Sequence, residues 1–206
     1  MPVRGGQVGD RRRRRTPEVA QREIVEAAEG LLRERPFREL TVDEVMRRTG
    51  LSRPSFYVYF KDRHELVLRV VGHLETELLA VANRWYESLG GGPPVLRDAL
   101  QGIVSVYGQH SAVLRALADA ATDDPEVEAA YTKLIENFIT VTAEHIELEA
   151  RAGNLVVTDP GEAAHALVWM NERYLYYAFG PERSVPQSKV LETLATIWTR
   201  ALYATT

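Results

Sequence analysis

TVDEVMRRTGLSRPSFYVYFKDRHEL, residues 41–66, is the stretch of this sequence that decides the fold. Thr41 and Glu44 have the spacing of a capping box, which satisfies backbone N–H groups at the start of a helix. Gly50 suits the left-handed conformation that often ends a helix, and Ser52 is a good N-cap for the next one. The stretch therefore predicts a helix-turn-helix, whose second helix can enter the major groove of DNA.

The second of these helices, about residues 53–60, has an apolar side and a polar side. Phe56 and Phe60 are four residues apart, so both are expected to face the protein interior. Arg53 falls on the opposite side, where its planar guanidinium suits the O6 and N7 acceptors of guanine. The polar side also carries Ser55, Tyr57 and Tyr59. An ordinary solvated surface would show the same residues, so DNA binding is one of two interpretations of this side.

Two parts of the chain resemble a known family. The pattern T-x-x-x-V-x-x-x-x-G-L-S-R-P-S-F-Y-x-Y-F, followed by K-D-R-H-E-L, is similar to the N-terminal DNA-binding domain of the TetR family of bacterial transcriptional regulators. LVWMNERYL (167–175) and SVPQSKVLETLATIW (184–198) resemble the effector domain of its EthR-like subgroup. The resemblance covers nearly the whole chain from about Glu18 onward. It implies a regulator with a helix-turn-helix domain followed by a helical effector-binding and dimerisation domain.

The resemblance also implies roles for individual residues at the DNA. Thr41, Tyr57 and Tyr59 would donate hydroxyl hydrogen bonds to backbone phosphates. Lys61 and Arg63 match a basic position that contacts phosphate, although the family usually has a serine-lysine pair where this chain has Asp62-Arg63. The predicted DNA-binding residues are Thr41, Arg53, Pro54, Ser55, Tyr57, Tyr59, Lys61 and Arg63.

Composition excludes several classes of protein. The chain of 206 residues has no cysteine, so disulfides, thiol nucleophiles and thiolate metal sites are excluded. No stretch resembles a signal peptide or a membrane span, and we expect a cytoplasmic protein without a cofactor or a membrane partner. The net charge of −4 is unevenly distributed. Residues 1–70 carry 16 Lys and Arg against 11 Asp and Glu, and the remainder carries 9 against 18. A basic front suits contact with a polyanion such as DNA.

Turn signals and helical periodicity divide the chain into three parts. Residues 1–16 are predicted to be a disordered basic arm, and Arg11–Arg15 within it is either a DNA-contacting arm or a solubilising tail. Residues 17–62 form the helix-turn-helix domain and 63–206 the ligand-binding and dimerisation domain. An all-α fold of about nine helices is expected, because no long alternating pattern suggests a strand. The helices outside the helix-turn-helix are predicted at 17–35, 62–88, 95–109, 112–121, 125–152, 160–179 and 186–204.

The C-terminal half carries the signs of a pocket. Asn171 falls on the apolar stripe of the penultimate helix, where a lone amide needs a hydrogen-bond partner. That partner is either a ligand, as the EthR-like resemblance implies, or another helix. The resemblance implies that a cluster of apolar and aromatic residues lines the cavity with it. The predicted effector-binding residues are Leu100, Ile103, Tyr107, Tyr131, Ile135, Phe138, Thr142, Met170, Asn171 and Trp198.

Three functions are consistent with these features. The leading hypothesis is a homodimeric repressor that binds a double-stranded DNA operator and is released by a small apolar effector. Pairing of the last two helices in the dimer is implied by the resemblance. An architectural DNA-binding protein without an effector is the alternative, and it predicts a helical half with no cavity. An enzyme acting on an apolar substrate is disfavoured, because the five histidines lack metal-ligand spacing and no phosphate loop or nucleophile elbow occurs.

Overall fold

The structure, a computed structural model, describes residues 16–203, and every regular element in this part of the chain is a helix. It contains eight α-helices and one 3-10 turn, η1 (Phe37–Glu39). The predicted all-α fold is confirmed. The predicted basic arm lies outside the described residues, except for Thr16. The helices are α1 (Pro17–Leu32), α2 (Val42–Thr49), α3 (Arg53–Tyr59), α4 (Arg63–Tyr86), α5 (Gly92–Ala120), α6 (Pro125–Arg151), α7 (Pro160–Ala178) and α8 (Gln187–Leu202).

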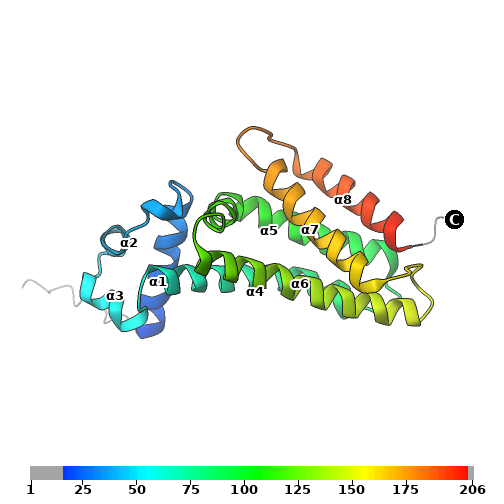
Figure 1. The fold of residues 1–206 in the computed structure, drawn as a ribbon, viewed down its shortest axis with the longest axis horizontal. Coiled ribbons are helices and arrows are strands. Elements are labelled where there is room, and N and C mark those ends of the chain that lie inside the picture. The colour runs from blue at the N-terminus through cyan, green and yellow to red at the C-terminus, as the bar shows by residue number, and fades with distance from the viewer. Residues whose placement is uncertain (1–15, 204–206) are drawn as a thin grey trace, which may run out of the picture.

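The first three helices form a small unit at one end of an elongated molecule (Figure 1). The Thr41 hydroxyl accepts a hydrogen bond from the Glu44 backbone N–H at 3.3 Å, which begins α2, and also donates to the Glu44 carboxylate at 2.9 Å. Gly50 ends α2 with a φ of 68°, in the left-handed region that disfavours other residues. Phe56 and Phe60 are fully buried beneath α3. The predicted helix-turn-helix is therefore present, with its apolar side in the core.

Helix α4 joins this unit to the rest of the molecule (Figure 1). Asp62 caps it by accepting from the Glu65 N–H at 3.0 Å. Its first half packs on α1, and its faces further along pack on α5 and α6. Leu66, Val70 and Leu74 are completely buried along these contacts.

One predicted boundary is wrong. The expected helices 95–109 and 112–121 are a single helix, α5, which continues through His110 and Ser111. Neither residue breaks a helix, and each finds a partner there. The His110 Nε2 lies 3.0 Å from the Glu77 carboxylate on α4, and the Ser111 hydroxyl donates to the Gly108 carbonyl at 3.4 Å. The inward face continues with Val113, so packing favours one long helix.

The remaining helices enclose the core of the C-terminal half. Helix α5 packs on α4, α6, α7 and α8, and α6 packs along α7 (Figure 1). Asp124 and Asp159 are N-caps of α6 and α7, since each side chain accepts from backbone N–H groups of the first turn. Within residues 16–203, none of the helices is both long and apolar enough to cross a bilayer.

Candidate functional site

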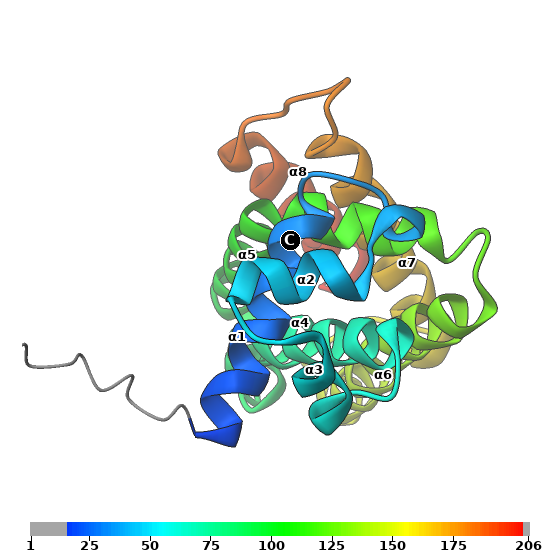
Figure 2. The same cartoon turned by 90° about the vertical axis from the view of Figure 1, so that its left-hand side faces the viewer.

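The outer side of α3 is exposed at the end of the molecule. Figure 2 views the molecule from this end, with α2 and α3 toward the viewer. Arg53 and Pro54 are exposed, and Tyr57 is 53% exposed. A short helix held on a buried aromatic base, with a cation and a phenol on its outer side, has the shape and chemistry for the DNA major groove.

Arg53 has a partner on this surface. Its Nη1 donates to an Asp43 carboxylate oxygen on α2 at 3.0 Å, and both side chains are more than half exposed. The Tyr57 side chain and then the Asp43 carboxylate raise the pKa of Arg53, so the guanidinium remains charged. An exposed pair of this kind contributes little to stability, about 0–1 kcal/mol. DNA can therefore replace Asp43 as the partner of Arg53.

The other predicted DNA residues on this side differ in exposure. Thr41 is exposed although its hydroxyl caps α2. Ser55 is half-buried, and its hydroxyl lies 2.8 Å from that of Ser52. Tyr59 is half-buried against the core, whereas Lys61 is exposed at the turn before α4. Thr41 and Lys61 are thus accessible to a DNA partner, whereas Ser55 and Tyr59 are partly covered.

Arg63 does not join this surface. Its guanidinium carbon lies 4.8 Å from the centre of the Phe37 ring, and Nη1 lies 3.5 Å from the carbonyl oxygens of Arg38 and Leu40. The aromatic face and the carbonyl oxygens at η1 attract the cation away from the outer side of α3. Its role as a phosphate contact stays a prediction, and in this arrangement it would require the side chain to turn away from Phe37.

Val58 is a residue of this surface that the sequence analysis missed. It is 75% exposed on α3, beside Tyr57. An apolar side chain in the major groove contacts the methyl group of thymine. Its position four residues after Pro54 is the signal that could have placed it on the outer side.

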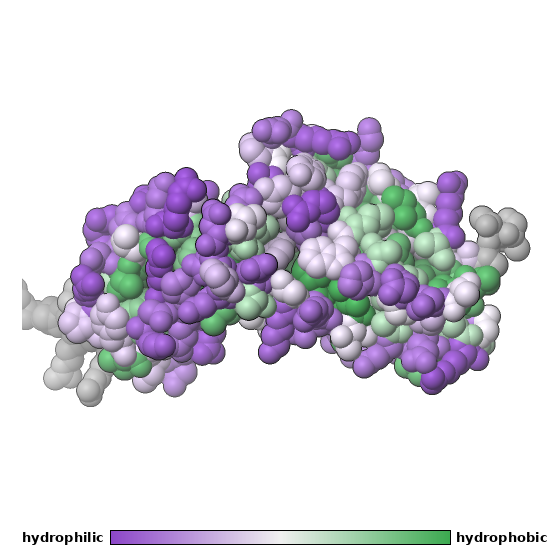
Figure 3. Space-filling view, viewed as in Figure 1, coloured by the Kyte–Doolittle hydropathy of each residue, from purple (hydrophilic) through white to green (hydrophobic). Residues whose placement is uncertain are grey.

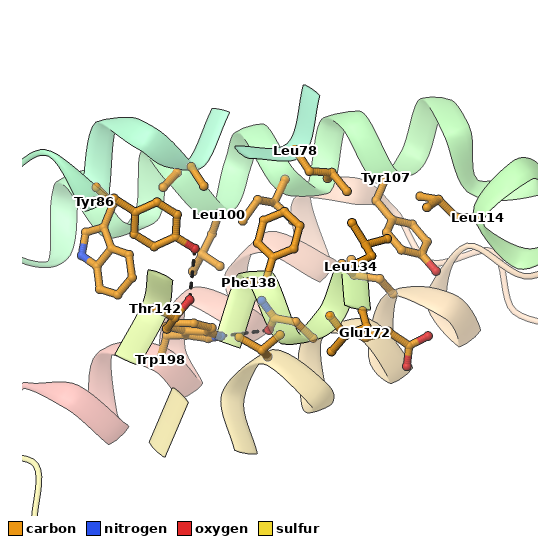
Figure 4. Close-up of a pocket in the computed structure, with 18 of the residues that line it drawn as sticks. Leu78, Tyr86, Leu100, Tyr107, Leu114, Leu134, Phe138, Thr142, Glu172 and Trp198 are labelled. Atoms are coloured by element: carbon orange, nitrogen blue, oxygen red, sulfur yellow. Dashed lines mark hydrogen bonds between the residues drawn. The ribbon is translucent and has the colours of Figure 1, made fainter. Parts of the chain in front are cut away.

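A second site lies inside the C-terminal half. A cavity of about 90 Å³ is enclosed by five helices, α4 to α8 (Figure 4). This is more than the roughly 10–15 Å³ that one water needs by the same measure. The lining is mostly apolar, and it extends from Leu96 to Leu114 on α5, which is about 27 Å at a rise of about 1.5 Å per residue. The lining residues are Leu78, Ala82, Trp85, Tyr86, Leu96, Ala99, Leu100, Ile103, Tyr107, Leu114, Tyr131, Leu134, Ile135, Phe138, Thr142, Val168, Asn171, Glu172, Leu175 and Trp198.

All but one of the predicted effector residues line this cavity. The exception is Met170, which is half-buried on α7 and packs against the core beside the cavity. Successive residues of a helix point about 100° apart, and on α7 it is Asn171 and Glu172, on the other side of Asn171 from Met170, that line the cavity. The nine that the structure brings together are Leu100, Ile103, Tyr107, Tyr131, Ile135, Phe138, Thr142, Asn171 and Trp198.

Asn171 is consistent with both hydrogen-bond partners that the sequence left open, a residue of another helix and a ligand. Its Oδ1 accepts a hydrogen bond from the Trp198 indole N–H at 2.8 Å, which ties α7 to α8 (Figure 4). It also lines the cavity, and its Nδ2 makes no hydrogen bond to another residue in 16–203. The amide nitrogen therefore remains a donor for a molecule in the cavity.

The two ends of the cavity carry further polar groups. At one end, the Tyr86 and Thr142 hydroxyls lie 3.0 Å apart and satisfy each other (Figure 4). At the other, the Tyr131 hydroxyl donates to the Glu172 carboxylate at 2.7 Å, with Tyr107 nearby. Burial, and then the negative charge of Glu172, raises the pKa of both Tyr107 and Tyr131, so both phenols keep their protons.

The sequence analysis missed Tyr86 and Glu172. Tyr86 is the last residue of α4, and nothing in its local sequence distinguishes it from a surface tyrosine. Glu172 directly follows Asn171 on the apolar stripe of α7, and a charged residue at the border of such a stripe was an available signal. In the described part of the chain, no group of three or more His, Asp or Glu side chains has the arrangement of a metal site.

An exposed helix-turn-helix joined by one long helix to a helical body with an internal cavity defines a class of DNA-binding regulators. The family model described as "Bacterial regulatory proteins, tetR family" matches residues 24–70, and "Transcriptional regulator EthR, C-terminal domain" matches residues 96–204. This chain therefore belongs to the TetR family of transcriptional regulators and resembles its EthR-like members.

Individual relatives agree with this assignment. The chain is 34% identical over 186 residues to HTH-type transcriptional regulator EthR of Mycobacterium tuberculosis H37Rv, covering 87% of this chain and 85% of that protein. It is 30% identical to EthR of Mycolicibacterium smegmatis, with 88% and 85% covered. The solved structure of Salmonella enterica GusR has the same fold, with a TM-score of 0.76 at 15% identity and 91% and 97% of the two chains covered. The protein is a DNA-binding transcriptional regulator, and not an enzyme.

Proposed function

We propose that this protein is a homodimeric repressor, released from a double-stranded DNA operator by a small apolar effector. Residues 17–62 bind DNA, and residues 63–206 bind the effector and form the dimer. The observation that carries the proposal is the cavity in the C-terminal half. Helix α4 lines this cavity and connects the C-terminal half to the helix-turn-helix unit. Ligand-responsive repression is typical of the family, and a regulator that binds DNA acts in the cytoplasm.

The contacts of α4 support a mechanism of release. The second half of α4 lines the cavity with Leu78, Ala82, Trp85 and Tyr86. Its first half packs on α1. An effector that fits the cavity better in one conformer shifts the population toward that conformer. If that conformer spaces the two α3 helices of the dimer wrongly for the two half-sites, the operator is released.

The roles of the site residues follow from their positions. Arg53 reads a base edge, Thr41, Ser55, Tyr57, Tyr59 and Lys61 position the protein on phosphates, and Pro54 with Val58 contacts apolar parts of the groove. In the cavity, the Asn171 Nδ2 anchors a polar group of the effector, and the aromatic and aliphatic residues around it exclude water. The alternative function, an architectural DNA-binding protein without an effector, is disfavoured because it predicts a helical half with no cavity.

DNA footprinting and native mass spectrometry test the proposal together. On the DNA upstream of its own gene, the protein should protect two half-sites related by two-fold symmetry. Protein carrying a co-purified apolar molecule should bind this site more weakly than protein from which the molecule has been extracted. Equal binding by loaded and extracted protein would favour the architectural reading, and absence of any protected site would contradict repression of its own gene.

Changing Asp43 to asparagine is expected to raise the affinity for the operator about two- to fivefold, within the roughly 1 kcal/mol that an exposed ion pair contributes. The change releases Arg53 and removes a negative charge from the surface that faces DNA. Fluorescence anisotropy at fixed salt measures the effect. Asp98→Asn is the matched control, because Asp98 is an exposed aspartate paired with Arg84 on the helical body. Weaker binding by Asp43→Asn would mean that Asp43 orients Arg53 for the DNA.

A further inference from the structure

We propose that the Glu172 end of the cavity binds a hydrogen-bond-donating head group, an amine or a hydroxyl, at the end of an apolar chain, and rejects a carboxylate. This inference rests on the proposed effector-binding function and names the chemical class of the effector. It is carried by three side chains at this end of the cavity: Tyr107 and Glu172, which Figure 4 labels, and Tyr131, whose hydroxyl donates to the Glu172 carboxylate.

The Glu172 carboxylate is buried and only partly satisfied. Its Oε1 accepts from the Tyr131 hydroxyl at 2.7 Å. Its Oε2 is fully buried and accepts no hydrogen bond from residues 16–203. The Arg173 Nε lies 3.3 Å from Oε2, which offsets part of the charge, but it does not have hydrogen-bond geometry. A buried acceptor without a donor is unfavourable, so a donor brought by a ligand would bind strongly here.

The Tyr107 hydroxyl is the second unsatisfied group. It is fully buried, forms no hydrogen bond within the described residues, and lies at the same end of the cavity as the Glu172 carboxylate (Figure 4). Because burial and then Glu172 raise the pKa of Tyr107, its hydroxyl stays protonated and can both donate and accept. The two orphan groups are Glu172 Oε2, which needs a donor, and Tyr107 Oη, which takes either role.

These two groups decide which head groups fit. An ammonium donates to both. A hydroxyl donates to Glu172 Oε2 and accepts from Tyr107. A carboxylate has no proton to donate, and it would place a second negative charge beside Glu172 in a medium of low dielectric constant. The remainder of the lining is apolar, including Leu78, Leu100 and Leu134, so the rest of the ligand is expected to be an aliphatic or aromatic chain.

A series of ligands with one chain and three head groups tests the inference. The full-length protein is titrated by calorimetry at pH 7 with n-octylamine, 1-octanol and octanoate. The amine or the alcohol should bind at least about tenfold more tightly than octanoate, from the usual strength of a hydrogen bond to a charged group. Equal binding of all three would overturn the head-group inference while leaving an apolar pocket in place. Binding of none would overturn both the inference and the proposed effector site.

Two variants connect the preference to Glu172. Glu172→Gln keeps an acceptor for Tyr131 and the side-chain volume but removes the charge, and it should reduce the amine-to-octanoate ratio at least about tenfold. The matched control is Glu149→Gln, because Glu149 is also a buried carboxylate but accepts from Gly90 and Asn154 away from the cavity. An unchanged ratio in folded Glu172→Gln protein, or the same loss in Glu149→Gln, would overturn the inference. Tight binding of the amine without release of DNA would instead count against the proposed repressor mechanism.

Discussion

Replacing Arg53 with alanine is expected to lower the affinity for the operator about 5- to 150-fold, and to leave the fold intact. A bidentate contact between arginine and guanine discriminates by about 1–3 kcal/mol, and each 1.4 kcal/mol is a factor of ten. The Arg53 side chain is 58% exposed and its ion pair with Asp43 lies on the surface, so the core does not depend on it. Anisotropy titration of a labelled operator measures the loss, and thermal unfolding checks the fold.

The variant Arg84→Ala is a control that distinguishes the loss of a base contact from the loss of one positive charge. Arg84→Ala also removes one exposed arginine, but from the helical body on α4, and it should change operator affinity little. In addition, Arg53→Ala should weaken binding to the operator more than binding to unrelated DNA, since a phosphate contact would weaken both equally. If the affinities for the operator and for unrelated DNA fell by the same factor, Arg53 would be a contact to the DNA phosphate backbone.

Replacing Ile197 with glutamate is expected to separate the proposed dimer and to weaken operator binding about a hundredfold or more. Two linked DNA-binding domains bind two half-sites with an affinity that is higher by about this factor than the affinity of one domain. Ile197 on α8 is 39% exposed and Tyr177 on α7 is 56% exposed, beside half-buried Trp169 and Met170. Figure 3 shows apolar residues gathered over α7 and α8. Exposed apolar area on adjacent helices is typical of a helical interface between two copies.

Sedimentation measures this prediction directly. The unmodified protein should have twice the 23.2 kDa mass of the chain, and Ile197→Glu should have the mass of one chain. Leu148→Glu is the control, because Leu148 is a similarly exposed leucine on α6, outside the proposed interface. A variant that remains dimeric at Ile197 would place the interface on another face.

Much of the fold was predictable because the residues that begin and end the helices do so through contacts with backbone groups close to them in the sequence. Thr41 caps the helix it precedes, and Gly50 takes the left-handed conformation that ends it. Such signals are local. The continuity of α5 is different, because the His110 contact with Glu77 is made across two helices and cannot be seen in either segment alone. That is why the sequence predicted two helices there.

The same distinction explains the candidate sites. Asn171 could be placed by its apolar surroundings on one helix, yet its partner Trp198 is 27 residues away. The contact of the Arg63 guanidinium with the Phe37 ring could not be predicted, because Phe37 comes from another segment. Glu172 was missed because a glutamate is usually solvated, and only the arrival of Tyr131 from α6 shows that it is buried. Residues whose roles depend on distant segments need the structure.

The exposed side of α3 and the lining of the cavity have no residue in common, although α4 begins soon after α3 ends and its second half lines the cavity. If the cavity binds the effector as proposed, exchanging side chains around it would change which compound releases the operator, while the genes under control remain the same. Conversely, in the same proposed mechanism, changes confined to α3 would bring a new set of genes under an existing chemical signal.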